Sequence, residues 1–308
     1  MTTNARLRAL VELADTGSVR AAAARLVVTE ASVSAALTAL AAEIGVPLLD
    51  RDGRGVRLTP AGRRYADYAR RILGLHAEAL ASARAEADPE RGRIRLAAVT
   101  TAGEHLIPGL LTSFLRRYPD VSVELEVAPR GVVWPMLTNH EVDLVIAGRP
   151  PESAHALVRA VSPNTLVVVG PAGTISPFEP ADATWLLREP ASGIRATMTA
   201  LLAELDIAPP VLALGSHGAV VAASVAGLGV TLVARQAVAT QLADGTLVEL
   251  AVRGTPLNRP WHAVSQPNPS STTELLVSHL LTLRSLGWRR PPGQVKREEH
   301  PRAYPIVD

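Results

Sequence analysis

The sequence predicts an α/β protein that begins with an all-α winged helix-turn-helix domain and a long linker helix. Two apolar-periodic segments with capping residues occupy residues 18–45, and a helical pattern runs from about 61 to 87. From residue 93 onward, strand and helix patterns alternate. With 308 residues, 47% of them apolar, the chain is long enough for two or three domains with their own cores.

The first helical pair lies between Ser18 and Gly45. Ser18 and Thr29 are suited to capping its two helices, because their hydroxyls accept hydrogen bonds from N–H groups of the first turn. Alanines in the first segment let the second helix approach closely. The second segment places four apolar residues on one face: Val33, Leu37, Leu40 and Ile44. This pattern predicts a helix-turn-helix, and an ordinary alanine-rich hairpin is the alternative.

The opposite face of the second helix is small and weakly polar, so it fits a groove about as wide as the DNA major groove. It carries Glu30, Ala31, Ser34, Ala35 and Thr38. Leu48–Gly62 then has two short apolar pieces around a glycine-rich turn, which predicts a β-hairpin wing. Three arginines on this hairpin suit phosphates and the narrow minor groove: Arg51, Arg54 and Arg57.

Residues 6–62 resemble the winged helix-turn-helix of LysR-type transcriptional regulators. The matching residues are Gly17, Ser18, Ala22, Ala23, Leu26, Val33, Ser34, Leu40, Gly45, Val46, Pro47, Leu48, Arg51, Leu58, Thr59, Pro60 and Gly62. Their spacing over more than fifty residues is far more specific than a single short motif. The resemblance implies a DNA-binding set of Ser18, Thr29, Glu30, Ala31, Ser32, Ser34, Ala35, Thr38, Arg51, Arg54, Arg57 and Thr59.

Three positions depart from the family pattern. Ala41 stands where Glu is usual and Leu49 where Phe is usual, and both changes adjust packing. Glu30 stands where Gln is usual. Its carboxylate lacks the amide donors and can accept a hydrogen bond from cytosine. Equally, it can serve as a favourable charge at the positive end of the helix dipole.

Composition narrows the class of protein. The chain has no cysteine, which excludes disulfides, thiolate catalysis and cysteine-based metal sites. The formal net charge is only +2, but residues 1–75 carry 11 arginines against 7 acidic residues, in keeping with DNA binding. The N-terminus is an amphipathic helix pattern unlike a signal peptide, and no apolar run approaches the roughly 20 residues of a membrane span. We therefore expect a cytoplasmic protein.

The helix predicted from about Ala61 to Ala87 has apolar residues at three-and-four spacing with nothing intrinsic to cover them. In the resembled family this is the linker helix through which two subunits dimerise, and packing on the neighbouring domain is the alternative. Ala87–Gly92, with its charges, proline and glycine, is predicted to be the hinge. The resemblance therefore implies residues 1–62 as the DNA-binding domain and 63–92 as linker and hinge.

The rest of the chain repeats a strand–helix unit, which predicts parallel sheets covered on both faces. Expected strands lie at residues 93–100, 121–128, 142–148, 165–170, 211–215, 230–234 and 262–266. The arrangement resembles the two-lobed, periplasmic-binding-protein-like effector domain of the same regulators, at residues 93–288. Lobe 1 is expected at about 93–162 and 267–288, lobe 2 at about 163–266, and a disordered tail at 289–308. Within the family, the segment is most like the Calvin-cycle operon activators.

A ligand is expected outside the carboxyl ends of the strands, where helix N-termini and hydroxyls provide donors and arginines can clamp an anion. The expected effector-binding residues are Thr100, Thr101, Arg130, Gly148, Ser192, Arg195, Thr197, Ser216 and His217. For the hydroxyl residues, simple helix capping is the alternative. No catalytic motif is present, and the histidines lack metal-ligand spacing. We therefore predict no catalytic residue, no metal and no cofactor.

Together these features predict a ligand-responsive transcriptional regulator of the LysR type. Its expected partners are double-stranded DNA with a pseudo-palindromic operator, a small anionic metabolite and further copies of itself in a homodimer or homotetramer. RNA polymerase is a further candidate partner, and no membrane is expected. Two other classes remain as alternatives: a small-molecule-binding protein without a DNA role, and an α/β enzyme with an accessory helical domain.

Overall fold

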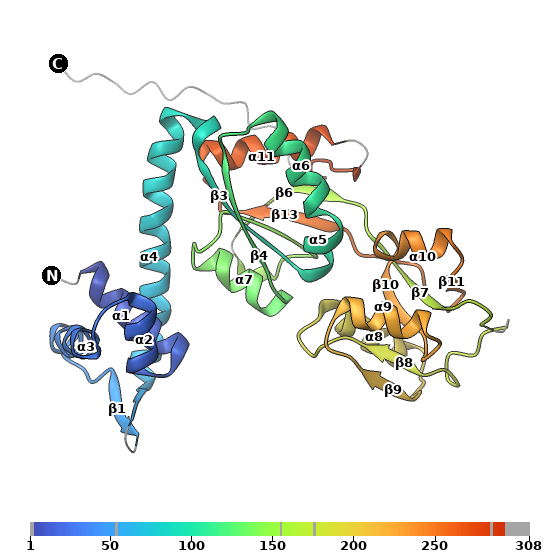
Figure 1. Ribbon diagram of the computed structural model, residues 1–308, viewed down its shortest axis with the longest axis horizontal. Coiled ribbons are helices and arrows are strands. Elements are labelled where there is room, and N and C mark those ends of the chain that lie inside the picture. Colours follow the sequence, from blue (N-terminus) through green and yellow to red (C-terminus); the bar gives the residue numbers. More distant parts are fainter. Residues whose placement is uncertain (1–2, 53–54, 155, 175–176, 284–285, 293–308) are drawn as a thin grey trace.

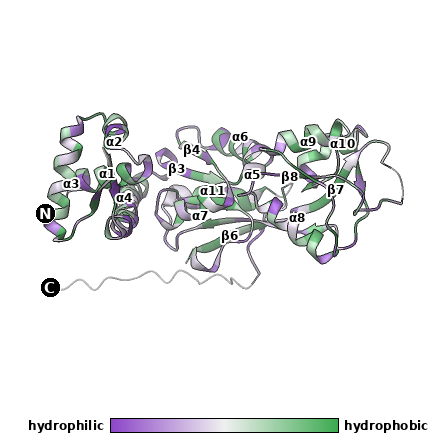
Figure 2. Ribbon diagram, turned by 90° about the horizontal axis from the view of Figure 1, so that it is seen from below, coloured by the Kyte–Doolittle hydropathy of each residue, from purple (hydrophilic) through white to green (hydrophobic). Residues whose placement is uncertain are grey.

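The computed structural model describes residues 3–52, 55–154, 156–174, 177–283 and 286–292. Figure 1 shows an N-terminal helical domain, one long helix that leaves it, and two α/β lobes that follow one another along the molecule. In Figure 2, hydrophobic residues lie on both the strands and the helices of the three parts. Each part has its own buried hydrophobic clusters, one in the N-terminal domain and two in each lobe.

The N-terminal domain contains three helices and a hairpin, as predicted. Its elements are α1 (Asn4–Thr16), α2 (Val19–Leu26), α3 (Glu30–Ile44), β1 (Leu49–Asp52) and β2 (Gly55–Leu58). Ser18 caps α2 and Thr29 caps α3, each by accepting a backbone N–H bond. The predicted apolar face of α3 is the buried one, and Leu40 at its centre is fully buried. Periodicity and caps therefore located these helices correctly.

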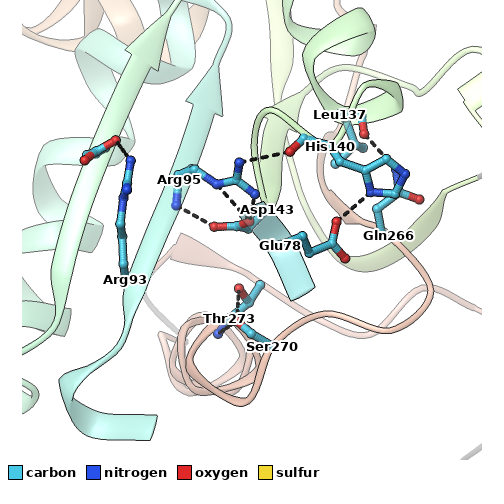
Figure 3. A network of polar contacts seen from close by, with 10 residues as sticks. Glu78, Arg93, Arg95, Leu137, His140, Asp143, Gln266, Ser270 and Thr273 are labelled. Carbon is cyan, nitrogen blue, oxygen red and sulfur yellow. Dashed lines mark hydrogen bonds and ion pairs between the residues drawn. The ribbon is translucent and has the colours of Figure 1, made fainter. Parts of the chain in front are cut away.

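Helix α4 (Pro60–Ala87) connects the N-terminal domain to the first lobe. Its first turns belong to the N-terminal core, where a Cβ on Gly62 would lie 2.1 Å from the Leu48 carbonyl oxygen. Further along, Gly74 packs equally closely on Asn139 of lobe 1. Figure 3 shows Glu78 of α4 facing His140, whose Nδ1 lies 2.5 Å from the Glu78 carboxylate. One helix thus contacts both domains.

Lobe 1 is built on a five-stranded sheet in the order β4-β3-β5-β13-β6. The strands are β3 (Arg93–Ala98), β4 (Ser122–Val127), β5 (Leu144–Ala147), β6 (Leu157–Ser162) and β13 (Trp261–Ser265). The helices are α5 (Thr100–His105), α6 (Ile107–Arg117), α7 (Arg130–Thr138) and α11 (Ser271–Thr282), with short 3-10 turns η1 (Pro89–Arg91) and η2 (Glu152–Ala154). Side chains alternate between two buried clusters, so both faces of the sheet are covered.

Lobe 2 is built around β7 (Thr165–Pro171), which pairs antiparallel with β10 (Thr231–Ala234), β11 (Leu247–Leu250) and β12 (Leu257–Asn258). A separate parallel pair consists of β8 (Trp185–Leu187) and β9 (Val211–Ala213). The helices are α8 (Gly193–Glu204), α9 (His217–Val225) and α10 (Ala239–Ala243), with the 3-10 turn η3 (Arg235–Val238). Valines of β7 alternate between the two cores of this lobe.

Three sequence expectations need correction here. The sheets are only partly parallel, because β6 and β13 run antiparallel to their neighbours in lobe 1 and the β7 sheet is antiparallel throughout. The strand expected at 262–266 exists, but it pairs with β5 and so belongs to lobe 1, not lobe 2. The chain therefore returns at residues 259–260, earlier than expected, whereas its first crossing at 163–164 lies where predicted.

The predicted tail begins too early. Arg289 exchanges two backbone hydrogen bonds with Val161 of β6, and the neighbouring Trp288 is buried. The rest of the predicted tail, from 293, lies outside the described residues. Within the described part of the chain, no single helix is long and apolar enough to cross a membrane, and the α2–α3 pair meets that test only jointly, with a bend of 106°.

Candidate functional sites

The exposed face of α3 is a small, nearly uncharged surface. Every predicted contact residue on this helix is exposed: Glu30, Ala31, Ser32, Ser34, Ala35 and Thr38. The helix is held at its start by Thr29, whose Oγ1 accepts from the Ser32 N–H at 3.1 Å. Further along, the Thr38 hydroxyl donates to the Ser34 carbonyl. Short side chains on a capped helix leave the backbone free to enter a groove closely.

The two remaining hydroxyls of the predicted DNA-binding set serve the fold. Thr59 is buried; its hydroxyl donates to the Pro47 carbonyl and accepts from the Gly62 N–H, both at 2.9 Å. Because both hydrogen-bonding roles are taken inside the domain, its assignment as a DNA contact was wrong. Ser18 is half-buried, and its side chain accepts from the Ala21 N–H.

The hairpin places Arg57 on the exposed side of β2. Arg51 lies in β1, paired in register with Val56. Arg54, at the predicted turn, lies outside the described residues. The hairpin therefore presents at least one exposed guanidinium beside the helical domain.

A cavity of about 700 Å³ lies between the two lobes. Six of the predicted effector residues line it: Thr100, Thr101, Arg130, Gly148, Ser192 and Thr197. They reach it from α5, α7, the end of β5 and the start of α8, which are the carboxyl ends of strands and the helix starts that follow them. The strand ends where a ligand was expected therefore border a cavity.

The cavity wall is strongly cationic. It contains four arginines and a single carboxylate, Glu189. Arg188 is buried and holds Glu189 with two hydrogen bonds of 2.8 and 2.6 Å. Burial acts to raise the pKa of Glu189, but the bonds and charge of Arg188, a backbone hydrogen bond and the charge of His217 together outweigh it, so the pKa is lowered. Among the described residues, no hydrogen bond or ion pair engages the side chains of the other three, Arg130, Arg149 and Arg259.

Two buried polar atoms in the cavity wall lack hydrogen-bond partners within the described structure: Asn164 Oδ1 and His262 Nδ1. Burial is the main cause that lowers the pKa of His262, and the charge of Arg149 adds to it. A hydrogen bond with the backbone of Pro260 acts in the opposite direction. The imidazole is therefore neutral near pH 7. Unpaired buried polar groups are costly, so they mark positions that a polar ligand can satisfy.

Three predicted effector residues lie outside the cavity. Arg195 donates to the Arg188 carbonyl at 2.9 Å and thus supports the wall from behind. Ser216 caps α9 by accepting from the Ala219 N–H. His217 is buried and stacks edge-on against His105, with 5.2 Å between ring centroids. For these three, ligand contact was the wrong assignment, because each side chain is turned toward its own helix or neighbour.

Sequence reasoning missed several residues of the wall: Arg149, Asn164, Arg188, Arg259, Trp261 and His262. Arg149 and Arg188 follow β5 and β8, so the strand-end rule could have found them. Asn164 and Arg259 lie on the two crossings, where the Arg259 N–H donates to the Asn164 carbonyl. Arg259 was missed because the second crossing was misplaced, and Asn164 was missed because ligand contacts were expected at strand ends and not on the crossings.

Two family models match the chain. Residues 5–63 match the bacterial regulatory helix-turn-helix protein of the lysR family, and residues 87–284 match the LysR substrate binding domain. The chain belongs to the LysR family of transcriptional regulators. It is accordingly a DNA-binding regulator with an effector-binding domain. This finding decides against the two alternative classes, an α/β enzyme and a small-molecule-binding protein without a DNA role.

The relatives agree with the expected branch of this LysR family. The transcriptional regulator CbbR of Xanthobacter flavus is 32% identical over 84% of this chain and 80% of its own length. The RuBisCO operon transcriptional regulator of Acidithiobacillus ferrooxidans is 32% identical over 79% of this chain and 81% of its own length. The crystal structure of full-length CbnR with its target DNA has a TM-score of 0.62 at 21% identity, covering 90% of this chain and 98% of that one. The likeness to the Calvin-cycle operon regulators is thereby confirmed.

Proposed function

We propose that this LysR-type regulator senses a small anionic metabolite in the cavity between its lobes. The observation that carries the proposal is the charge of the wall: three guanidiniums without a partner among the described residues face a cavity whose single carboxylate is already paired with Arg188. Guanidiniums bind carboxylates and phosphates in bidentate fashion, so an anion is the ligand class that this wall favours.

Further contacts fit the same ligand class. The N-terminus of α8 opens at the cavity through Ser192 and Gly193, and its free N–H groups favour negative charge. Arg130 and Arg149 lie in lobe 1, whereas Arg188 lies in lobe 2 and Arg259 on a crossing. An anion bound by both lobes favours their closed arrangement over an open one, and that preference is what changes the geometry of the DNA-binding domains.

We also propose which macromolecules this regulator binds: a second copy of itself, an operator and RNA polymerase. Exposed Tyr68, Ile72, Leu75 and Leu80 on α4 support pairing with a second copy, as a homodimer or homotetramer, which sedimentation velocity of the full chain tests. Such pairing places two α3 helices roughly 34–36 Å apart, or multiples of that, on a pseudo-palindromic operator. The phosphate contacts then come from the hairpin arginines. RNA polymerase is a candidate partner at the promoter, and chromosomal DNA implies a cytoplasmic protein.

The effector proposal is tested by titrating the purified full chain with phosphorylated and carboxylated metabolites, with neutral sugars as controls, at constant ionic strength. Binding is measured as a shift in thermal midpoint and by calorimetry. Arg130→Ala and Arg149→Ala should each weaken binding of an active anion about tenfold or more, because a charged hydrogen bond contributes about 1.5–3 kcal/mol.

A matched control is Arg116→Ala, which removes an exposed arginine of α6 outside the cavity. It should bind the anion like the parent chain. An anion that binds equally well to the parent and to both cavity variants would overturn the proposed site.

A further inference from the structure

Three potential metal ligands meet at the boundary between the lobes. Glu104 and His105 lie at the end of α5 in lobe 1, and His217 begins α9 in lobe 2. One ligand atom from each of the three lies within 4.8 Å of the others. In Figure 1, α5 is at the edge of lobe 1 that faces the helices of lobe 2. The cluster is therefore contributed by two bodies of the structure, not by one continuous segment.

We propose that Glu104, His105 and His217 form a binding site for Zn²⁺ that links the two lobes. Two imidazoles and one carboxylate with an open fourth position are a donor set that zinc accepts in proteins, with water as the remaining ligand. Hard cations such as Mg²⁺ prefer oxygen ligands, so the two histidines favour zinc over them. The site lies apart from the anion cavity and does not depend on the identity of the effector.

His217 is the residue whose state favours a metal. It is buried with 3% of its surface exposed, and its Nδ1 has no hydrogen-bond partner within the described structure. Burial, then the charges of Arg188 and His105, lower its pKa to about 4 against the opposing charge of Glu189. An unpaired ring nitrogen buried this deeply is costly, and a bond to a metal or its ligand shell would offset that cost.

The other two ligands can complete the coordination by small movements. The His105 Nε2 lies 3.8 Å from the Glu104 carboxylate, and both side chains are partly exposed, at 35% and 45%. Zinc–ligand bonds of about 2.0–2.1 Å separate neighbouring ligand atoms by about 3.3 Å in a tetrahedron, so the ligand atoms must approach one another by at most about 1.5 Å. Rotation of partly exposed side chains supplies this. The nearby Arg188 charge is offset by Glu189, to which it is doubly bonded.

A bound ion would fix the separation of the lobes. Thr100 and Thr101 on the same short α5 line the anion cavity, and Thr101 receives a long hydrogen bond from Arg188 of lobe 2. Zinc would therefore hold the two sides of the cavity at this distance. This consequence rests on the proposed effector function, whereas metal binding itself is measured without any effector.

The experiment titrates metal-free, untagged full-length protein with Co²⁺ and then Zn²⁺. We expect one Co²⁺ per chain with the intense visible absorption of tetrahedral coordination, displaced by Zn²⁺, and a higher thermal midpoint with zinc. His105→Ala and Glu104→Gln should weaken zinc at least about tenfold, since even outer-shell changes cost about that much. Both residues are partly exposed, so these variants should fold, which circular dichroism checks.

His76→Ala is the matched control, because it removes an exposed histidine of α4 and leaves the cluster intact. It should retain the cobalt spectrum and the zinc affinity of the parent chain. The proposal is overturned if the parent chain binds no zinc, or if His105→Ala binds it as tightly as the parent.

Discussion

The two binding surfaces of this regulator are built in opposite ways. The surface that we predict to face DNA comes mainly from α3, a capped helix of 15 residues, and its predicted contact residues are short and, apart from Glu30, uncharged. The effector cavity is assembled from separate segments of both lobes and carries four arginines. The first surface exists as soon as one small domain folds. The second exists only while the two lobes are held together, so we expect the strength of ligand binding to depend on lobe separation.

The same contrast extends to buried ionisable groups. Residues 1–75 contain no histidine at all. Residues 93–288 contain six histidines, and in three of them burial is the main cause of a lowered pKa: His217, His262 and His279. We therefore expect mildly acidic pH to lower the free energy of unfolding of the effector domain through its histidines. The N-terminal domain, which has no histidine, should not be destabilised in this way.

The largest effect that we predict is a loss of effector-domain stability below pH 6.5, caused by His217. Its pKa is about 4 when folded and 6.5 in the reference state, so between these values only the unfolded chain binds the proton. The contribution is fully present above pH 6.5 and is lost as the pH falls toward 4, reaching about 3 kcal/mol. Denaturant unfolding in EDTA buffer, from pH 7.5 to 4, measures it.

His217→Gln isolates this contribution, because glutamine does not titrate and the other two histidines remain. The parent chain should lose about 3 kcal/mol more than this variant across the window. Equal pH dependence of the two would mean that His217 is not the group responsible. The unfolding transition of the N-terminal domain should be the same in both.

The contrast between the two surfaces also explains what the sequence could predict. The helices, caps and wing of the N-terminal domain follow from local signals: Thr29 caps α3 and Leu40 lies at the centre of its buried face, as their spacing requires. Thr59 was misassigned because a capping hydroxyl and a DNA-contacting hydroxyl look alike in sequence. Only its burial separates the two roles.

In the effector domain the seven expected strands exist, but β6, β8 and β11 were not expected, and the long-range pairing was predicted incorrectly. The strand at 262–266 was recognised, but its pairing with β5, far away in the sequence, leaves no trace in its own residues. The misplaced second crossing concealed Arg259, whereas Asn164 lies on the first crossing, to which the strand-end rule does not apply. His105 and His217 showed no metal-ligand spacing in sequence because tertiary packing alone brings them together.

A smaller effect should follow from reversing one charge on the hairpin. Arg57→Glu removes an exposed cation that is suited to a phosphate, so the slope of log affinity against log salt should fall by about 1. Near 0.1 M salt this corresponds to about tenfold weaker binding. Fluorescence anisotropy with DNA from upstream of the gene, at several salt concentrations, measures both.

Arg116→Glu changes the net charge of the chain equally, on an exposed position of the effector domain. It should leave the salt slope unchanged, because screening removes effects of distant charges. A matching loss of affinity in the two variants would indicate a general charge effect and refute the hairpin contact. Anion binding in the cavity should be the same in Arg57→Glu as in the parent chain.

The smallest predicted effect concerns Glu30, the one charged residue among the predicted DNA contacts of α3. It stands in the first turn of α3, where a carboxylate favours the positive end of the helix dipole. Glu30→Gln should therefore destabilise the N-terminal domain by about 0.3–1 kcal/mol at low salt, and less at 1 M salt where the dipole is screened.

Selection of preferred operators from random DNA, run with the parent chain and with Glu30→Gln, separates the two roles of this residue. If Glu30 accepts a bond from cytosine, the preference at one base pair should change by about tenfold or more, since a good contact contributes about 1–3 kcal/mol of discrimination. Unchanged preference with reduced stability assigns Glu30 to the dipole alone, and the α3 surface then reads DNA through its small side chains.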